Sequence, residues 1–315
     1  MPYARLAEAP VASALAADEL ARLTQEAAAA AGPWIGENDK NGADGAAVDA
    51  MRAVLAEGNL SCRVRSCEGE KDEAPMFPYG EEFGARGGRP DYDIFIDPID
   101  RTTAVARGTE GGISVAALAP HGNLPKWTGP YMKKLVVPPA ASEPLRTGAV
   151  RVDGDPTRNL QAIADALGIN AKDLRVAVLE RERNRRIIEA AQKLGAHAIL
   201  LEGGDVLPVI HMLEEGQDDL ILYGSGGVPE GLIVAIHAAA KGAGMQGAAD
   251  PQNPAQARKA MEEGVLGRVM DLATLAGNRD LHFAATAITD NEIMDGAYRE
   301  KGQWQPGTTI SASKL

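Results

Sequence analysis

Apolar positions along the chain form two kinds of pattern. Short apolar runs, which are typical of buried strands, occur at residues 92–96, 175–179, 196–201 and 219–223, and a short strand-like segment occurs at residues 61–66. Longer stretches with helical spacing occur at residues 11–31, 46–55, 184–194, 206–215 and 230–241. Because strands and helices alternate in the second half, we expect βαβα units with at least partly parallel strands there. Ligands of such sheets bind beyond the carboxyl ends of the strands.

The strongest chemical signal directly follows the predicted strand at 92–96. Asp97 and Asp100 lie on either side of the dipeptide Pro98-Ile99. Pro98 has no backbone N–H, so we expect it to stop the ladder and fix a turn in which both carboxylates and the Ile99 carbonyl face one point. Such oxygen ligands suit Mg²⁺ or Mn²⁺, ions that pair with substrate phosphates. An isolated Asp-Pro-x-Asp is also common as a plain turn.

Two further acidic segments lie at predicted element ends. Residues 68–73, beginning with Glu68, follow the strand-like run at 61–66, and Asp44 lies at the start of the helical stretch at 46–55. Carboxylates repeated at element ends favour a shared cation site. A solvated, charged surface is the alternative.

Motifs in a fixed order carry a family resemblance. From about Trp34 to Thr309 the chain resembles the class II fructose-1,6-bisphosphatases, members of the lithium-sensitive, metal-dependent sugar phosphatase superfamily. The motifs occupy residues 36–47, 68–76, 97–100, 131–135, 204–206, 226–231 and 283–286. Any one of them is weak, whereas the series in order is specific.

The resemblance implies a fold, a domain organisation and a reaction. The implied fold is a layered α/β/α/β/α sugar phosphatase with two packed, sheet-containing halves: residues 1–145 bind metal, and residues 146–315 bind the sugar phosphate, with the last segment returning to the first half. The implied reaction removes the 1-phosphate of fructose 1,6-bisphosphate by direct attack of a water activated by Mg²⁺ or Mn²⁺. Similar enzymes are often dimers or tetramers, so the resemblance also implies a homo-oligomer.

The resemblance also assigns roles to individual positions. The residues matching metal-surrounding positions are Asp44, Glu68, Asp97, Asp100 and Glu230. Thr102 matches a threonine that orients or activates the attacking water. The residues matching contacts to the sugar bisphosphate are Lys40, Tyr131, Arg181, Arg183 and Asp205, and Asp100, Arg101 and Glu230 also border the substrate. Lysine and arginine suit the second phosphate, arginine through its bidentate fork.

Three positions depart from the family pattern. Arg101 replaces a glycine that permits a positive φ, at a cost of about 1 kcal/mol or more if that conformation is kept. Gly203 replaces an acid associated with sugar hydroxyls, and Ala248 replaces a common arginine. These departures leave two alternatives open: a diverged paralogue that hydrolyses another sugar or cyclitol phosphate, including sedoheptulose 1,7-bisphosphate, or a non-catalytic sugar-phosphate-binding protein.

Several of these residues also have simpler interpretations. Arg181 and Arg183 lie in a charged run that is compatible with a salt-bridged helix start, and Tyr131 is compatible with a core aromatic. The glycine-rich stretch at 224–231 suggests a dinucleotide loop, but Pro229 stands where the third fingerprint glycine belongs. We expect this stretch to lie between a strand and a helix and to bring Glu230 near the metals.

Composition narrows the class of protein. The 315 residues are 45% hydrophobic, with a formal net charge of −12 and a pI near 5.0. The acidic balance, without a basic block, argues against nucleic-acid binding. Cys62 and Cys67 have no histidine or cysteine cluster nearby, so we expect neither a zinc site nor a disulfide framework. We expect a cytoplasmic protein without a signal peptide or membrane span.

Overall fold

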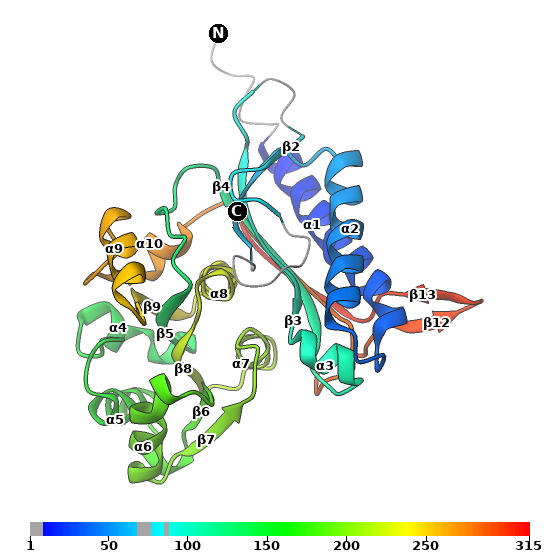
Figure 1. The fold of residues 1–315 in the computed structure, drawn as a ribbon. Coiled ribbons are helices and arrows are strands. Elements are labelled where there is room, and N and C mark those ends of the chain that lie inside the picture. The colour runs from blue at the N-terminus through cyan, green and yellow to red at the C-terminus, as the bar shows by residue number, and fades with distance from the viewer. Residues whose placement is uncertain (1–8, 68–76, 85–87) are drawn as a thin grey trace. The chain divides into compact units, whose positions relative to one another are not determined.

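The computed structural model describes residues 9–67, 77–84 and 88–315. The chain divides into two compact units: unit 1 holds the chain up to Asn123 together with Asn278–Leu315, and unit 2 holds Leu124–Gly277. Within the described residues each unit contains a six-stranded mixed sheet with helices packed against it (Figure 1). The expected α/β class with two sheet-containing parts is therefore confirmed.

The sheet of unit 1 has the strand order β14-β11-β4-β3-β1-β2. Its strands are β1 (Cys62–Cys67), β2 (Glu82–Phe83), β3 (Tyr92–Asp100), β4 (Ile113–Pro120), β11 (Leu281–Ala287) and β14 (Thr309–Lys314). β1 and β3 are parallel, whereas β3, β4, β11 and β14 pair antiparallel in turn. A separate two-stranded ribbon consists of β12 (Tyr298–Glu300) and β13 (Gln303–Gln305). The C-terminal segment thus completes a sheet begun by the first third of the chain.

Two long helices pack side by side on one face of this sheet (Figure 1). α1 (Ala9–Ala31) is rich in alanine, which allows close packing, and the 3₁₀ turn η1 (Gly32–Trp34) follows it. α2 (Lys40–Glu57) begins at the N-cap Asp39, whose side chain accepts a hydrogen bond from Gly42 N at 2.9 Å. A short helix, α3 (Thr102–Arg107), directly follows β3. The side chains buried between the helices and the sheet include Leu20, Leu23, Met51, Ile94 and Ile96.

The sheet of unit 2 has the strand order β10-β9-β5-β8-β6-β7. Its strands are β5 (Tyr131–Val137), β6 (Arg175–Leu179), β7 (His197–Leu201), β8 (Leu220–Gly227), β9 (Gly244–Ala249) and β10 (Val269–Asp271). β6 pairs parallel with both β7 and β8, which confirms the partly parallel sheet expected for this region. β5 pairs antiparallel with β8 and β9.

Helices cover both faces of this second sheet. The helices of unit 2 are α4 (Ser142–Thr147), α5 (Pro156–Leu167), α6 (Arg185–Leu194), α7 (Leu207–Glu214), α8 (Val228–Lys241), α9 (Pro254–Glu262) and α10 (Leu272–Ala276), with 3₁₀ turns η2 (Pro139–Ala141), η3 (Ala171–Asp173) and η4 (Glu182–Asn184). Leu135 and Tyr223 pack with residues of α4, α5 and α6 on one face. On the other face a Cβ at Gly231 of α8 would lie 2.1 Å from the Met132 sulfur, so this glycine permits close packing of α8 on β5.

Residues 139–144, near the expected boundary at residue 145, form η2 and the first half of α4 inside unit 2. The polypeptide instead passes between the units at Asn123–Leu124 and Gly277–Asn278. Prolines at 138, 139 and 144 are compatible with this outcome because proline is tolerated in the first turn of a helix.

Two other expectations concern cysteine and membranes. Cys62 is a free, buried thiol on β1, and burial is the main cause that raises its pKa to about 12. The side chain of Cys67 lies outside the described residues. None of the described helices combines the length and hydropathy required to span a bilayer.

Candidate active site

The acidic turn at the end of β3 is built differently from the expectation. Pro98 does not stop the ladder: β3 continues to Asp100, with a bulge between Asp97 and Asp100. Asp97 pairs with Val115 and Asp100 with Ile113, so β3 contains one more residue than β4 between these two pairs. A bulge tolerates a proline because its residue need not donate to the ladder.

This bulge has a consequence for side-chain direction. Val115 and Ile113 are two residues apart on β4 and therefore point to the same face of the sheet. Cross-strand partners share a face, so Asp97 and Asp100 also point to one face although they are three residues apart. Both are almost fully buried. The two carboxylates thus lie on one side of the sheet, as expected, but through an added residue rather than a turn.

Thr102 links Asp44 to this acidic segment. It is the first residue of α3, and its hydroxyl lies 3.1 Å from Asp44 Oδ1 and 3.0 Å from the Ile99 carbonyl oxygen, either of which can accept its hydrogen bond. Asp44 comes from the second turn of α2, which the Asp39 cap positions. The Thr102 side chain therefore connects the Asp44 carboxylate, which is distant in sequence, to the junction between β3 and α3.

Arg101 has a left-handed backbone conformation, which glycine adopts without cost. Its φ is 65° and its ψ is 48°, so the residue before α3 is left-handed. Its carbonyl still accepts the first helical hydrogen bond, from Ala104 N at 2.8 Å. The side chain is partly buried. A left-handed conformation costs an L-residue about 1–2 kcal/mol, and such strain often lies at functional sites.

Neither of the two remaining acidic candidates belongs to the described part of unit 1. Glu68 lies outside the described residues, and Glu230 belongs to unit 2. Within the described residues no three histidine, cysteine or acidic side chains form a group that holds a metal ion. Lys40, the first residue of α2, is exposed, and the residues before it line a shallow hollow that includes Trp34 and Asp39.

In unit 2 the structure joins Asp205 to a buried lysine. Lys134 on β5 places its ammonium nitrogen 2.7 Å from Asp205 Oδ2 and 3.0 Å from the Gly227 carbonyl oxygen. Glu230, in the first turn of α8, folds back against Gly227, where a Cβ would lie 1.9 Å from Glu230 Oε2. Gly224–Gly227 form the end of strand β8 rather than a loop, which corrects the expectation for the glycine-rich stretch.

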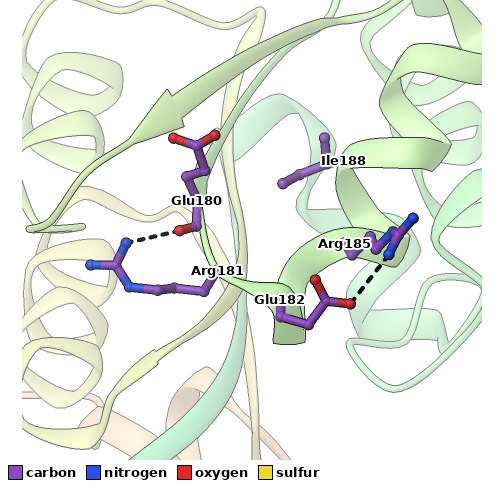
Figure 2. A pocket seen from close by; sticks show the side chains of 5 residues that line it. All are labelled: Glu180, Arg181, Glu182, Arg185 and Ile188. Atoms are coloured by element: carbon purple, nitrogen blue, oxygen red, sulfur yellow. Dashed lines mark hydrogen bonds and ion pairs between the residues drawn. The ribbon is translucent and has the colours of Figure 1, made fainter.

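Arg181 and Arg183 differ in their surroundings. Figure 2 shows Arg181 in a surface pocket with its guanidinium directed to the carbonyl of Glu180. Its Nη1 donates to Glu180 O at 2.8 Å and its Nη2 to Glu202 O at 2.5 Å. The ion pairs of this charged run are formed instead by Arg185, which contacts Glu182 and Glu189. A salt-bridged helix start thus describes Arg185 rather than Arg181.

Arg183 stacks on Tyr131. Its guanidinium carbon lies 4.5 Å from the centre of the Tyr131 ring, and its Nε donates to Ser225 O at 3.1 Å. The structure shows no hydrogen bond from its terminal nitrogens to a described residue. A guanidinium whose plane is held by stacking and by its Nε hydrogen bond is suited to bind phosphate in a bidentate manner through its terminal nitrogens.

Sequence reasoning overlooked Lys134. The strand pattern contains a signal for it. Positions 132, 134 and 136 share one face of β5, and Met132 and Val136 on that face are fully buried. A lysine at the middle inward position of a buried strand requires an internal partner.

Comparisons with known proteins agree with this arrangement of motifs. The family model described as "Bacterial fructose-1,6-bisphosphatase, glpX-encoded" matches residues 14–314. A Synechococcus sp. (strain JA-3-3Ab) protein named D-fructose 1,6-bisphosphatase class 2/sedoheptulose 1,7-bisphosphatase is 34% identical, over 94% of this chain and 91% of its own length. An Escherichia coli (strain K12) protein named fructose-1,6-bisphosphatase 2 class 2 is 37% identical, over 88% of this chain and 89% of its own length. The chain therefore belongs to the glpX-type family of bacterial fructose-1,6-bisphosphatases.

Proposed function

We propose that this protein is a Mg²⁺- or Mn²⁺-dependent phosphatase that removes the 1-phosphate of fructose 1,6-bisphosphate. The observation that carries the proposal is the hydrogen-bonded junction of Asp44, Thr102 and Ile99 beside a bulge that turns Asp97 and Asp100 to one face. The family and the names of the relatives supply the substrate.

The donor set fits a hard divalent cation. The candidate ligands are Asp44, Glu68, Asp97, Asp100 and Glu230, which offer carboxylate oxygens alone. Such a set suits Mg²⁺ or Mn²⁺ and does not suit zinc, which prefers histidine and cysteine. A bound dication neutralises charge on the transferring phosphoryl group and lowers the pKa of water.

Thr102 is suited to orient the attacking water. A hydroxyl that donates to Asp44 or to the Ile99 carbonyl keeps lone pairs with which it accepts a hydrogen bond from water. Asp44 then receives a proton from the water as the water oxygen bonds to phosphorus. The sugar oxygen takes up a proton from solvent as its bond to phosphorus breaks. The products are fructose 6-phosphate and inorganic phosphate.

Basic and polar side chains recognise the sugar bisphosphate. Arg183, held by its stacking on Tyr131, binds the second phosphate, and Asp205 accepts hydrogen bonds from sugar hydroxyls. Lys40, Arg101 and Arg181 complete the basic contacts. Arg181 must exchange backbone carbonyl partners for phosphate to do so.

Phosphate release from fructose 1,6-bisphosphate with added Mn²⁺ or Mg²⁺ tests the proposal. Asp97→Asn and Thr102→Val should reduce turnover by about 100-fold or more, because each removes a group that acts in the proton transfer or charge neutralisation. Thr102→Ser should retain activity because it keeps the hydroxyl. Asp49→Asn, which removes an exposed carboxylate from the same helix as Asp44, is the matched control. Normal turnover by a folded Asp97→Asn variant would contradict the site.

A specific observation favours a broader substrate range as the second candidate. Arg101 combines a strained, left-handed backbone with a guanidinium, and the Synechococcus relative is named for two bisphosphates. A panel that includes sedoheptulose 1,7-bisphosphate and other sugar and cyclitol phosphates separates the possibilities. A preferred ester other than fructose 1,6-bisphosphate identifies a diverged paralogue, and binding without turnover identifies a sugar-phosphate-binding protein.

We also propose a cytoplasmic homo-oligomer, a dimer or tetramer, whose turnover is inhibited by lithium. Light scattering coupled to size exclusion measures the mass of the assembly. Replacement of potassium chloride by lithium chloride at constant ionic strength tests the inhibition, which should appear as loss of turnover at unchanged folding.

A further inference from the structure

Lys134 is a buried lysine in the middle of a sheet. Its side chain is 1% exposed, on the face of β5 that also carries Met132 and Val136. Its cross-strand neighbours are glycines, Gly224 on β8 and Gly247 on β9. Glycines on both sides leave room for the four-carbon stem of lysine to lie along the sheet.

The ammonium group of Lys134 is fully engaged. It lies 2.9 Å and 2.7 Å from the two carboxylate oxygens of Asp205 and 3.0 Å from the Gly227 carbonyl oxygen, which together match the three donors of an ammonium. The side chain of Asp205 is 4% exposed. Asp205 thus has its carboxylate held from one side, at the turn that leads into α7.

Stability alone does not account for this pair. A buried ion pair gains little net stability over well-packed apolar side chains, because desolvation of the charges offsets their attraction. What the pair does supply is a fixed direction for the Asp205 carboxylate. The same ammonium also binds the carbonyl of Gly227, against which Glu230 is folded, so a single lysine connects the loop of Asp205 to the start of α8.

We propose that Lys134 is a positioning residue that holds Asp205 in the orientation needed to accept hydrogen bonds from the sugar. This inference rests on the proposed function, which supplies the sugar ligand. Lys134 itself contacts protein atoms and acts through Asp205. Its loss should therefore weaken recognition of the sugar and leave recognition of the phosphate unchanged.

A double-mutant cycle on KM tests the inference. Lys134→Met and Asp205→Asn should each raise the KM for fructose 1,6-bisphosphate about ten-fold or more, the size expected for a lost hydrogen bond to a charged group. The double variant should have the KM of Asp205→Asn alone, because Lys134 has no effect without its carboxylate. The inhibition constant of inorganic phosphate should stay at the wild-type value in all three.

Gly226→Ala perturbs the same contact without removing either charge. A Cβ at Gly226 would lie 2.2 Å from Asp205 Oδ2 and 3.0 Å from Lys134 Nζ, so the carboxylate has to move. This variant should also raise the KM, and it decides the question if Lys134→Met does not fold. Lys241→Met is the matched control, because it removes a lysine–carboxylate pair of the same 2.7 Å length elsewhere in unit 2.

Each outcome has a definite meaning. An unchanged KM in folded Lys134→Met or in Gly226→Ala overturns the inference, as does a double variant whose KM increase is the product of the two single increases. A rise in the phosphate inhibition constant parallel to KM also overturns it, because the effect is then on the whole site. Absence of fructose bisphosphate hydrolysis by the wild-type chain is a separate failure, that of the proposed function.

Discussion

Arg101→Gly should stabilise the protein. The left-handed conformation of Arg101, with φ 65° and ψ 48°, costs an L-residue about 1–2 kcal/mol, and glycine adopts it without that cost. Glycine also gives the unfolded chain more conformational freedom, which offsets roughly 0.5–1 kcal/mol of the gain. The expected net gain is about 0.5–1 kcal/mol. Since about 1 kcal/mol shifts the melting temperature of a domain of 150–250 residues by roughly 2–4 °C, we expect an increase of about 1–4 °C.

Thermal unfolding followed by circular dichroism measures this increase, and two variants separate strain from charge. Arg101→Ala removes the guanidinium but keeps the strained backbone, so its melting temperature should not rise. Lys301→Gly relieves the same kind of strain at an exposed turn between β12 and β13, where φ is 50°. A melting temperature for Arg101→Gly at or below that of Arg101→Ala would refute the reasoning. Stabilisation accompanied by a higher KM for the substrate would show that the strain is retained for function.

Two other predictions follow from buried titratable groups. Burial raises the pKa of the Cys62 thiol to about 12, so iodoacetamide at pH 8 should leave Cys62 unmodified in the folded protein and should alkylate it in denaturant. Peptide mass spectrometry detects the alkylation, and rapid labelling of the native protein would contradict the prediction. Burial also lowers the pKa of His237, which contacts Glu214, below the unfolded value of about 6.5. Below about pH 6.5 the unfolded chain binds a proton at His237 that the folded chain does not bind. The free energy of unfolding therefore has its full value above about pH 6.5 and decreases as the pH falls below it. Melting temperatures between pH 8 and pH 5.5 should fall less steeply in His237→Gln, and an unchanged slope would count against the assignment.

Local pattern predicted a large part of the fold. The runs at 92–96, 175–179 and 196–201 mark β3, β6 and β7, and the helical stretches at 184–194 and 230–241 mark α6 and α8 to within a few residues. Some elements were overlooked although their signals are ordinary. α5 has Asp155 as its N-cap, Pro156 in its first turn and a left-handed Gly168 at its end, the full set of signals for a helix.

The bulge in β3 shows why local rules fail at the candidate site. A proline after a strand is correctly interpreted as a break in the ladder when only the strand itself is considered. The partner strand changes the outcome, because β4 pairs on both sides of Pro98 and the extra residue is absorbed as a bulge. The register of two strands is a property of their pairing, and the sequence of one strand does not determine it.

Lys134 shows a second limit, which concerns partners distant in sequence. Its burial is compatible with a folded protein only because Asp205, 71 positions later, and the Gly227 carbonyl meet its ammonium group. The glycines that make room for it, Gly224 and Gly247, come from two different strands. In the sequence Gly224 belongs to a glycine-rich stretch that suggests a dinucleotide loop, and a lysine is most often a surface charge. Both suggestions consider one segment at a time. Lys134 and the glycines become neighbours only when β5, β8 and β9 pair, so the buried contact between Lys134 and Asp205 emerges with the sheet.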